Sequence, residues 1–119
     1  MVGLFKTPKR RLKKLVQNGD YKEAIELGNS LEEKYATDVD FLFIMGGIYY
    51  ILEDAQSTLH YIDRVLEISE SDPDALFLKA SVHVYLKETN IARKCCKKIL
   101  ENYPKNTNAK EMLDKLDKD

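Results

Sequence analysis

Apolar residues recur along the chain at the spacing of an amphipathic helix, and start and stop signals bracket each recurrence. Thr7 followed by Pro8 predicts that a first helix begins at Pro8, because proline is favoured at the first helical position. Asn18 and Gly19 predict where this helix ends. No segment alternates apolar and polar residues for long enough to indicate a strand. The pattern therefore predicts an all-α protein.

The same signals predict six further helices. An aspartate that can serve as N-cap precedes four of them, and these residues are Asp20, Asp38, Asp54 and Asp72. The apolar face of the second helix continues to Tyr35. The predicted ranges of the six helices are 20–35, 38–52, 54–68, 72–86, 89–102 and 107–118.

The helices repeat with a period of 34 residues that runs along the chain without a gap. One position of the cycle holds only small residues, and another holds only branched aliphatic residues. The small residues are Ala24, Thr58 and Ala92, and the aliphatic residues are Leu31, Val65 and Ile99. This register divides one domain into the repeats 5–38, 39–72 and 73–106, followed by a final helix at 107–118.

The contents of the repeats resemble the tetratricopeptide repeat, a helix–turn–helix unit of the same length. The second repeat carries Leu42, Gly46 and Tyr49 at positions where that family has a large residue, a glycine and a tyrosine. The resemblance implies an α–α superhelix, a helix–turn–helix solenoid of three repeats with 107–118 as capping helix. Four residues depart from the family pattern at a small, an aromatic, a tyrosine and a turn-glycine position, and these are Leu12, Gly28, His83 and Lys87.

The resemblance also implies a binding groove on the concave face, which the first helices of the repeats form. We expect this groove to bind an apolar or amphipathic peptide of a partner protein. The expected apolar seat consists of Phe43, Ile44, Tyr50, Phe77, Leu78 and Tyr85. Lys9, Arg10 and Lys13 are expected to anchor an acidic flank of the ligand. The alternative is that the apolar side chains pack against a neighbouring helix.

One branch of the family clamps the C-terminal carboxylate of heat-shock chaperones with lysine and asparagine side chains at fixed groove positions. Lys9 fits the first lysine of that clamp. Lys13 and Ile44 stand where the clamp has asparagines, and Asp74 and Leu78 replace its third-repeat bases. The resemblance therefore does not extend to this clamp.

The net charge of −1 conceals a basic, an acidic and a second basic region. Residues 1–19 carry six bases and no acid, whereas residues 20–88 carry fifteen acids and five bases. The basic start permits an alternative function as an adaptor for nucleic acid or an anionic membrane. The acidic middle disfavours nucleic acid because it repels phosphate. A further alternative is a homodimer in which the apolar grooves of two copies pack together.

The sequence holds no motif of a catalytic site. Cys96 and His83 fall on core positions of the repeat, whereas Cys95 and His60 point elsewhere, and the spacing of these four residues does not suit zinc. We therefore expect a non-enzymatic protein without cofactor or metal. With no signal peptide and no apolar run long enough to cross a bilayer, the expected location is the cytoplasm.

Overall fold

The computed structural model describes residues 7–118, and these residues form seven α-helices and no strand. The helices are α2 (Pro8–Gln17), α3 (Tyr21–Leu31), α4 (Val39–Ile51), α5 (Ala55–Ile68), α6 (Pro73–Tyr85), α7 (Thr89–Asn102) and α8 (Thr107–Lys118). The predicted all-α class is confirmed, and so is the presence of each predicted helix, but the second helix is shorter than predicted. The first two residues of the predicted repeat 5–38 lie outside the described residues.

Aspartate side chains fix the starts of the three central helices. Asp38, Asp54 and Asp72 each accept a hydrogen bond from a backbone N–H in the first turn of the helix that follows. Pro8 and Pro73 occupy the first positions of α2 and α6, as predicted. Asp20 differs from the prediction because its side chain makes no capping hydrogen bond to α3.

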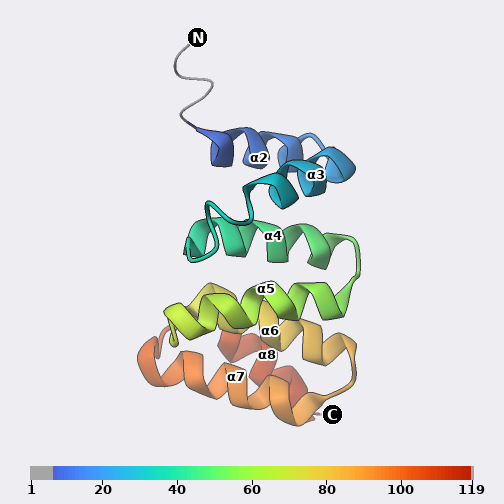
Figure 1. Ribbon diagram of the computed structural model, residues 1–119. Helices are drawn as coiled ribbons and strands as arrows, with labels where there is room; N and C mark the ends of the chain where they lie inside the picture. Colours follow the sequence, from blue (N-terminus) through green and yellow to red (C-terminus); the bar gives the residue numbers. More distant parts are fainter. Residues whose placement is uncertain (1–6, 119) are drawn as a thin grey trace.

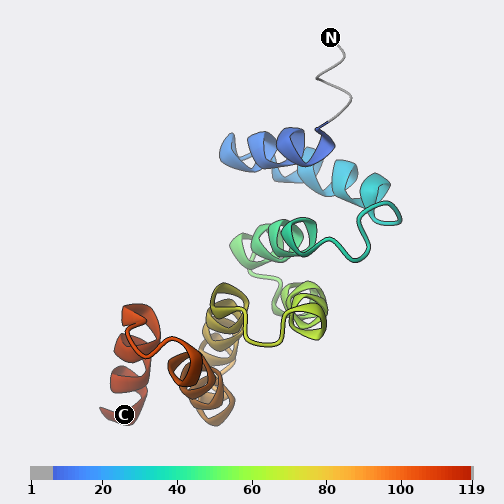
Figure 2. The same ribbon diagram turned by 90° about the vertical axis from the view of Figure 1, so that its left-hand side faces the viewer.

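The helices stack as successive antiparallel pairs along one axis, as Figures 1 and 2 show, and α8 packs against α7. The molecule measures 53 × 26 × 22 Å. Its radius of gyration is 15.5 Å, whereas a compact domain of this length has about 13 Å. This elongated stack of helix pairs is the helix–turn–helix solenoid that the sequence predicts.

The apolar core runs through the whole stack in two clusters. The first joins α2 to α5, reaches α6 at Ala75, and includes Leu12, Phe41 and Ile62, all with no exposed surface. The second joins α6, α7 and α8 and includes Ile99 and Leu116. Because each cluster draws on several helices, no helix pair completes its own core, and the pairs stabilise one another by stacking.

Two helical glycines permit the close packing around α4. A Cβ atom at Gly28 of α3 would overlap the sulfur of Met45. A Cβ atom at Gly46 would lie 2.8 Å from Cδ1 of Ile62 on α5. Gly28, which departs from the family pattern in the sequence, is therefore the residue that makes room for Met45.

Helix α3 ends at Leu31, four residues before the predicted end at Tyr35. Residues 32–37 form turns instead, and α5 holds them by polar contacts. Arg64 Nη1 lies 2.6 Å from Glu32 Oε1, and Arg64 Nη2 donates to the carbonyl oxygen of Ala36 at 3.0 Å. Tyr61 donates its hydroxyl to Glu32 at 3.0 Å. Burial, together with this carboxylate, raises the pKa of Tyr61 to about 12.

The turn inside each helix pair contains one residue in the left-handed backbone region. These residues lie 34 apart in the sequence, and they are Gly19 (φ 79°), Glu53 (φ 60°) and Lys87 (φ 63°). Glycine adopts this conformation without steric cost, whereas a residue with a Cβ atom does not. Lys87 thus keeps the geometry of a glycine turn although it lacks the glycine.

We predict that Lys87→Gly raises the free energy of unfolding by about 0.5–1 kcal/mol, because it removes the strain of a Cβ atom at positive φ. Gly19→Ala should lower it by about 1 kcal/mol for the converse reason. Urea denaturation followed by circular dichroism measures both. Lys87→Gln, which keeps the Cβ atom, is the control and should change little. A loss of stability in Lys87→Gly would contradict the prediction.

Candidate functional site

A cavity of about 400 Å³ opens between α4, α6 and the start of α8. We call it the α4–α6 groove. It is lined by Phe43, Tyr50, Pro73, Asp74, Phe77, Leu78, Ser81, Asn106 and Asn108. The aromatic and aliphatic side chains project from two helices that belong to consecutive pairs, so the stacking of the pairs creates the groove.

Four of the six residues of the expected apolar seat line this groove, namely Phe43, Tyr50, Phe77 and Leu78. Tyr50 is 44% exposed, and the other three are half-buried because they also pack against the core clusters. Ile44 does not line the groove and packs against the first core cluster. For Ile44 the structure therefore supports the alternative of packing against neighbouring helices.

The polar residues of the groove are mostly engaged in local structure. Ser81 donates its hydroxyl to the carbonyl oxygen of Phe77 at 2.9 Å. Asn106 Oδ1 accepts a hydrogen bond from Ala109 N at 2.9 Å at the start of α8. Asp74 is exposed, and it is the one charged side chain among the residues that line the groove. The groove is therefore apolar with an acidic edge.

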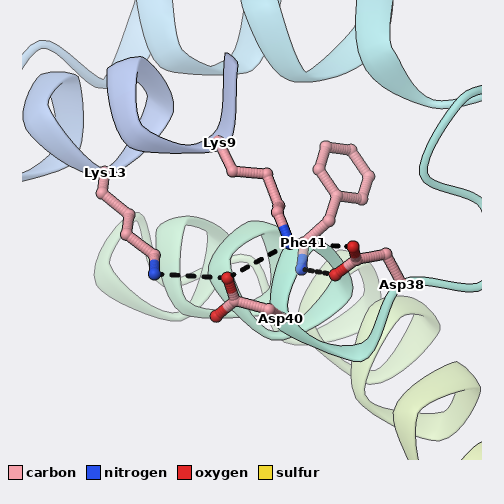
Figure 3. Close-up of polar contacts among 5 residues, drawn as sticks. All are labelled: Lys9, Lys13, Asp38, Asp40 and Phe41. Atoms are coloured by element: carbon pink, nitrogen blue, oxygen red, sulfur yellow. Dashed lines mark hydrogen bonds and ion pairs between the residues drawn. The ribbon is translucent and has the colours of Figure 1, made fainter. Parts of the chain in front are cut away.

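Two of the three expected basic anchors are paired with acids at the N-terminus of α4, the N-cap Asp38 and Asp40, as Figure 3 shows. Lys9 Nζ lies 2.8 Å from Asp38 Oδ2 and 3.7 Å from Asp40 Oδ2. Lys13 Nζ lies 3.2 Å from Asp40 Oδ2. Arg10 is exposed and has no ion-pair partner among the described residues. Lys9 and Lys13 therefore join α2 to the start of α4.

The contact between Lys9 and Asp38 favours the charged form of both groups. The hydrogen bond from Lys9 is the largest cause that lowers the pKa of Asp38, and the backbone N–H of Phe41 adds to it. The same hydrogen bond raises the pKa of Lys9. Sequence reasoning missed this pair, although a basic first helix followed by an acidic region was the signal that indicated it.

A second cavity, of about 280 Å³, lies beside the groove at the ends of α4 and α6, and we call it the edge pocket. It is lined by Tyr50, Ile51, Glu53, Asp54, Ala55, Thr58, Val82 and Tyr85. Tyr85, expected in the groove, lies here and is 64% exposed. Tyr50 lines both cavities, so they share one aromatic wall.

The cysteines are both buried, which corrects the expectation that Cys95 points away from the core. Cys95 is 7% exposed and Cys96 has no exposed surface. Burial raises the pKa of both thiols, that of Cys96 to about 11, so they are poor nucleophiles at neutral pH. His83 is buried on a core position, as predicted.

Residues 7–118 bring together no group of three or more His, Cys, Asp or Glu side chains that could hold a metal ion. Within the same residues, no helix combines the length and apolarity needed to cross a membrane.

Solved structures similar to this chain are tetratricopeptide repeat domains. No family model matches the sequence, and no curated protein matches it either. The first tetratricopeptide repeat of Spaghetti (RPAP3), bound to the HSP90 peptide SRMEEVD, has a TM-score of 0.86 and 19% identity, over 94% of this chain and 89% of that one. The NMR structure of the first such domain of human RPAP3 has a TM-score of 0.83 and 19% identity, over 94% of this chain and 88% of that one. The NMR structure of the second human RPAP3 domain, in complex with the HSP70 peptide SGPTIEEVD, has a TM-score of 0.84 and 18% identity, over 95% of this chain and 94% of that one.

We predict that Asp38→Asn lowers the free energy of unfolding by about 0.2–1 kcal/mol at neutral pH, because asparagine keeps the helix cap and loses the ion pair with Lys9. Asp72→Asn is the matched control. Asp72 caps α6 without an ion pair, so the control should be neutral. Equal losses in both variants would contradict the prediction. Urea denaturation measures both.

The difference in the free energy of unfolding between wild type and Asp38→Asn should depend on pH, and it should shrink in strong acid and in strong base. The pKa of Asp38 in the folded protein lies below the ordinary 3.8. The ion pair therefore contributes its full stability above pH 3.8, and this stability is lost as the pH falls through the folded pKa. The folded pKa of Lys9 lies above the ordinary 10.5, so the contribution is again lost as the pH rises through the folded value. A difference that persists in strong acid would contradict the assignment.

Proposed function

We propose that this chain, a solenoid with the tetratricopeptide repeat fold, is a protein-interaction module that binds an apolar segment of a partner in the α4–α6 groove. The observation that carries the proposal is the apolar lining of this open cavity by Phe43, Phe77 and Leu78, with Tyr50 beside them exposed to solvent. Exposed apolar surface of this kind usually marks an interaction site. Two of the similar structures hold peptides, which supports the same function.

The charges of the groove favour a ligand other than an acidic C-terminal peptide. Asp74 is the charged residue of the groove, and Asp40 lies on the exposed side of the Lys9 and Lys13 contacts. An acidic ligand would approach these carboxylates and would have to displace existing ion pairs. The proposed ligand therefore has a neutral or basic flank, in place of the acidic flank expected from the sequence.

The same contacts weaken the alternative in which the basic end binds nucleic acid or a membrane. Of the expected basic anchors, only Arg10 has no acidic partner among the described residues. Salt dependence separates the two functions, because contacts with phosphate weaken steeply with salt and an apolar groove does not. The homodimer alternative predicts a doubled mass in light scattering, which the Phe77→Asp substitution would return to that of the monomer.

We predict that Phe77→Ala or Phe43→Ala weakens binding by about 1–3 kcal/mol, as expected for an aromatic anchor in a groove. The ligand would be a peptide selected from a displayed random library, with affinity measured by calorimetry. Tyr103→Ala is the control, because Tyr103 is an exposed aromatic residue outside the groove. The variants should remain folded. Unfolding of Phe77→Ala or Phe43→Ala would show that the ring belongs to the core and not to the binding surface.

We also predict that the peptide SRMEEVD does not bind measurably to this chain, because Asp74 and Leu78 replace the bases that a carboxylate clamp requires. Fluorescence anisotropy of the labelled peptide measures this, with the first domain of RPAP3 as the positive control. Any saturable binding to this chain would contradict the prediction, and its loss in Lys9→Ala would assign that binding to the basic end.

A further inference from the structure

The edge pocket is an apolar cavity that the proposed groove ligand does not need. It lies where α4 turns into α5 and where α6 ends, on the side of the stack where these turns gather in Figure 1. Only Tyr50 is common to both cavities. The edge pocket can therefore bind a group that does not enter the groove.

Exposed apolar side chains are found at the ends of α4 and α6 in the second and third repeats, and three of them line this pocket, Tyr50, Ile51 and Tyr85. Residues 50–52 are Tyr, Ile and Leu, and residues 84–86, at the equivalent positions 34 residues later, are Val, Tyr and Leu. All six are 38–64% exposed. The equivalent positions of the first repeat are Val16, Gln17 and Asn18, of which the last two are polar. The solenoid thus carries an exposed apolar edge beside the pocket.

Two carboxylates line the pocket, and no basic residue does. The Glu53 side chain makes no hydrogen bond or ion pair with the described residues. Asp54 accepts hydrogen bonds from the backbone N–H and the hydroxyl of Ser57, at 3.0 and 2.8 Å. These bonds lower the pKa of Asp54, so it is charged at neutral pH. Negative charge beside two tyrosine rings, those of Tyr50 and Tyr85, is a favourable surrounding for a cation.

Glu53 occupies its place at a conformational cost. Its φ of 60° lies in the left-handed region, and Gly19 takes the equivalent position in the first repeat. A glycine there would relieve the strain and would remove the carboxylate from the pocket. The strained residue thus also carries a charge that has no partner among residues 7–118.

We propose that the edge pocket binds the arginine side chain of an apolar partner segment. The guanidinium group lies against the rings of Tyr50 and Tyr85, where its flat, weakly hydrated surface stacks well, and its positive charge faces Glu53 and Asp54. The apolar part of the partner covers the exposed edge at residues 50–52 and 84–86. This site shares only Tyr50 with the groove, because Glu53, Asp54 and Tyr85 do not line the groove.

The test uses benzylguanidinium, a small mimic of an arginine beside an apolar group, and benzylurea, its uncharged analogue of the same shape. Both are titrated into the isotopically labelled chain and followed by NMR. We expect saturable shifts at the backbone amides of Ile51, Glu53 and Ala55 with benzylguanidinium, and binding at least about fivefold weaker with benzylurea. Equal binding of the two probes, or shifts that do not saturate, would overturn the proposal.

Variants assign the effect to the carboxylate. Glu53→Gln should weaken benzylguanidinium binding about three- to tenfold. Glu101→Gln, which removes an exposed charge on α7 outside the pocket, should leave it unchanged. Glu53→Gly should weaken binding to a similar extent while the melting temperature stays the same or rises, which excludes misfolding as the cause. An unchanged affinity in both Glu53 variants would refute the role of the charge.

A second copy of this chain is the other occupant to be tested, because α2 carries exposed arginines. Light scattering of the wild type and of Tyr85→Asp decides this point. A monomer in both supports the proposal. A dimer that Tyr85→Asp abolishes would show that the edge is an interface between copies, and it would overturn the proposal.

Discussion

Helix α4 is the element on which the rest of the stack depends, because α2, α3 and α5 all pack against it. Phe41, Met45 and Ile48 have no exposed surface, and the two close approaches at Gly28 and Gly46 bring α3 and α5 against this helix. An ordinary surface helix buries one apolar stripe and leaves the remainder polar. Since α4 is apolar nearly all round, the side that no helix covers becomes the wall of the α4–α6 groove.

Ion pairs complete the contact between the first helix pair and the second, where α3 is short. Lys9 and Lys13 reach Asp38 and Asp40 from one side, and Arg64 reaches Glu32 and the turn after α3 from the other. Exposed pairs of this kind contribute little stability each, and they add to the apolar contacts that the first core cluster makes between the two helix pairs. The basic and acidic regions of the sequence are therefore partly complementary within one molecule.

The helices were predictable because their signals are local. Proline at the first turn, an aspartate cap and apolar spacing lie within a few residues of one another, and the period of 34 residues repeats them. The end of α3 was not predictable in this way, because Tyr35 fits the apolar spacing and the turn is held by Arg64, far away in sequence. The prediction that Cys95 points away from the core was wrong for the same reason, since the burial of this residue depends on packing between helices.

The candidate site was predictable only in part, because position within a repeat indicates the face of a helix and not which neighbours cover it. Phe43 and Phe77 both line the groove, whereas Ile44, one residue further, is half-buried against the core and does not line it. The packing of the capping helix α8 helps to explain which apolar surface of the solenoid remains exposed. Ala109 and Leu116 of α8 close the end of the solenoid against α7, so the exposed apolar surface of the groove and the edge pocket is not an unfinished end of the stack. Because the chain covers this apolar end and leaves its apolar side open, the open side offers the surface that the proposed binding function requires.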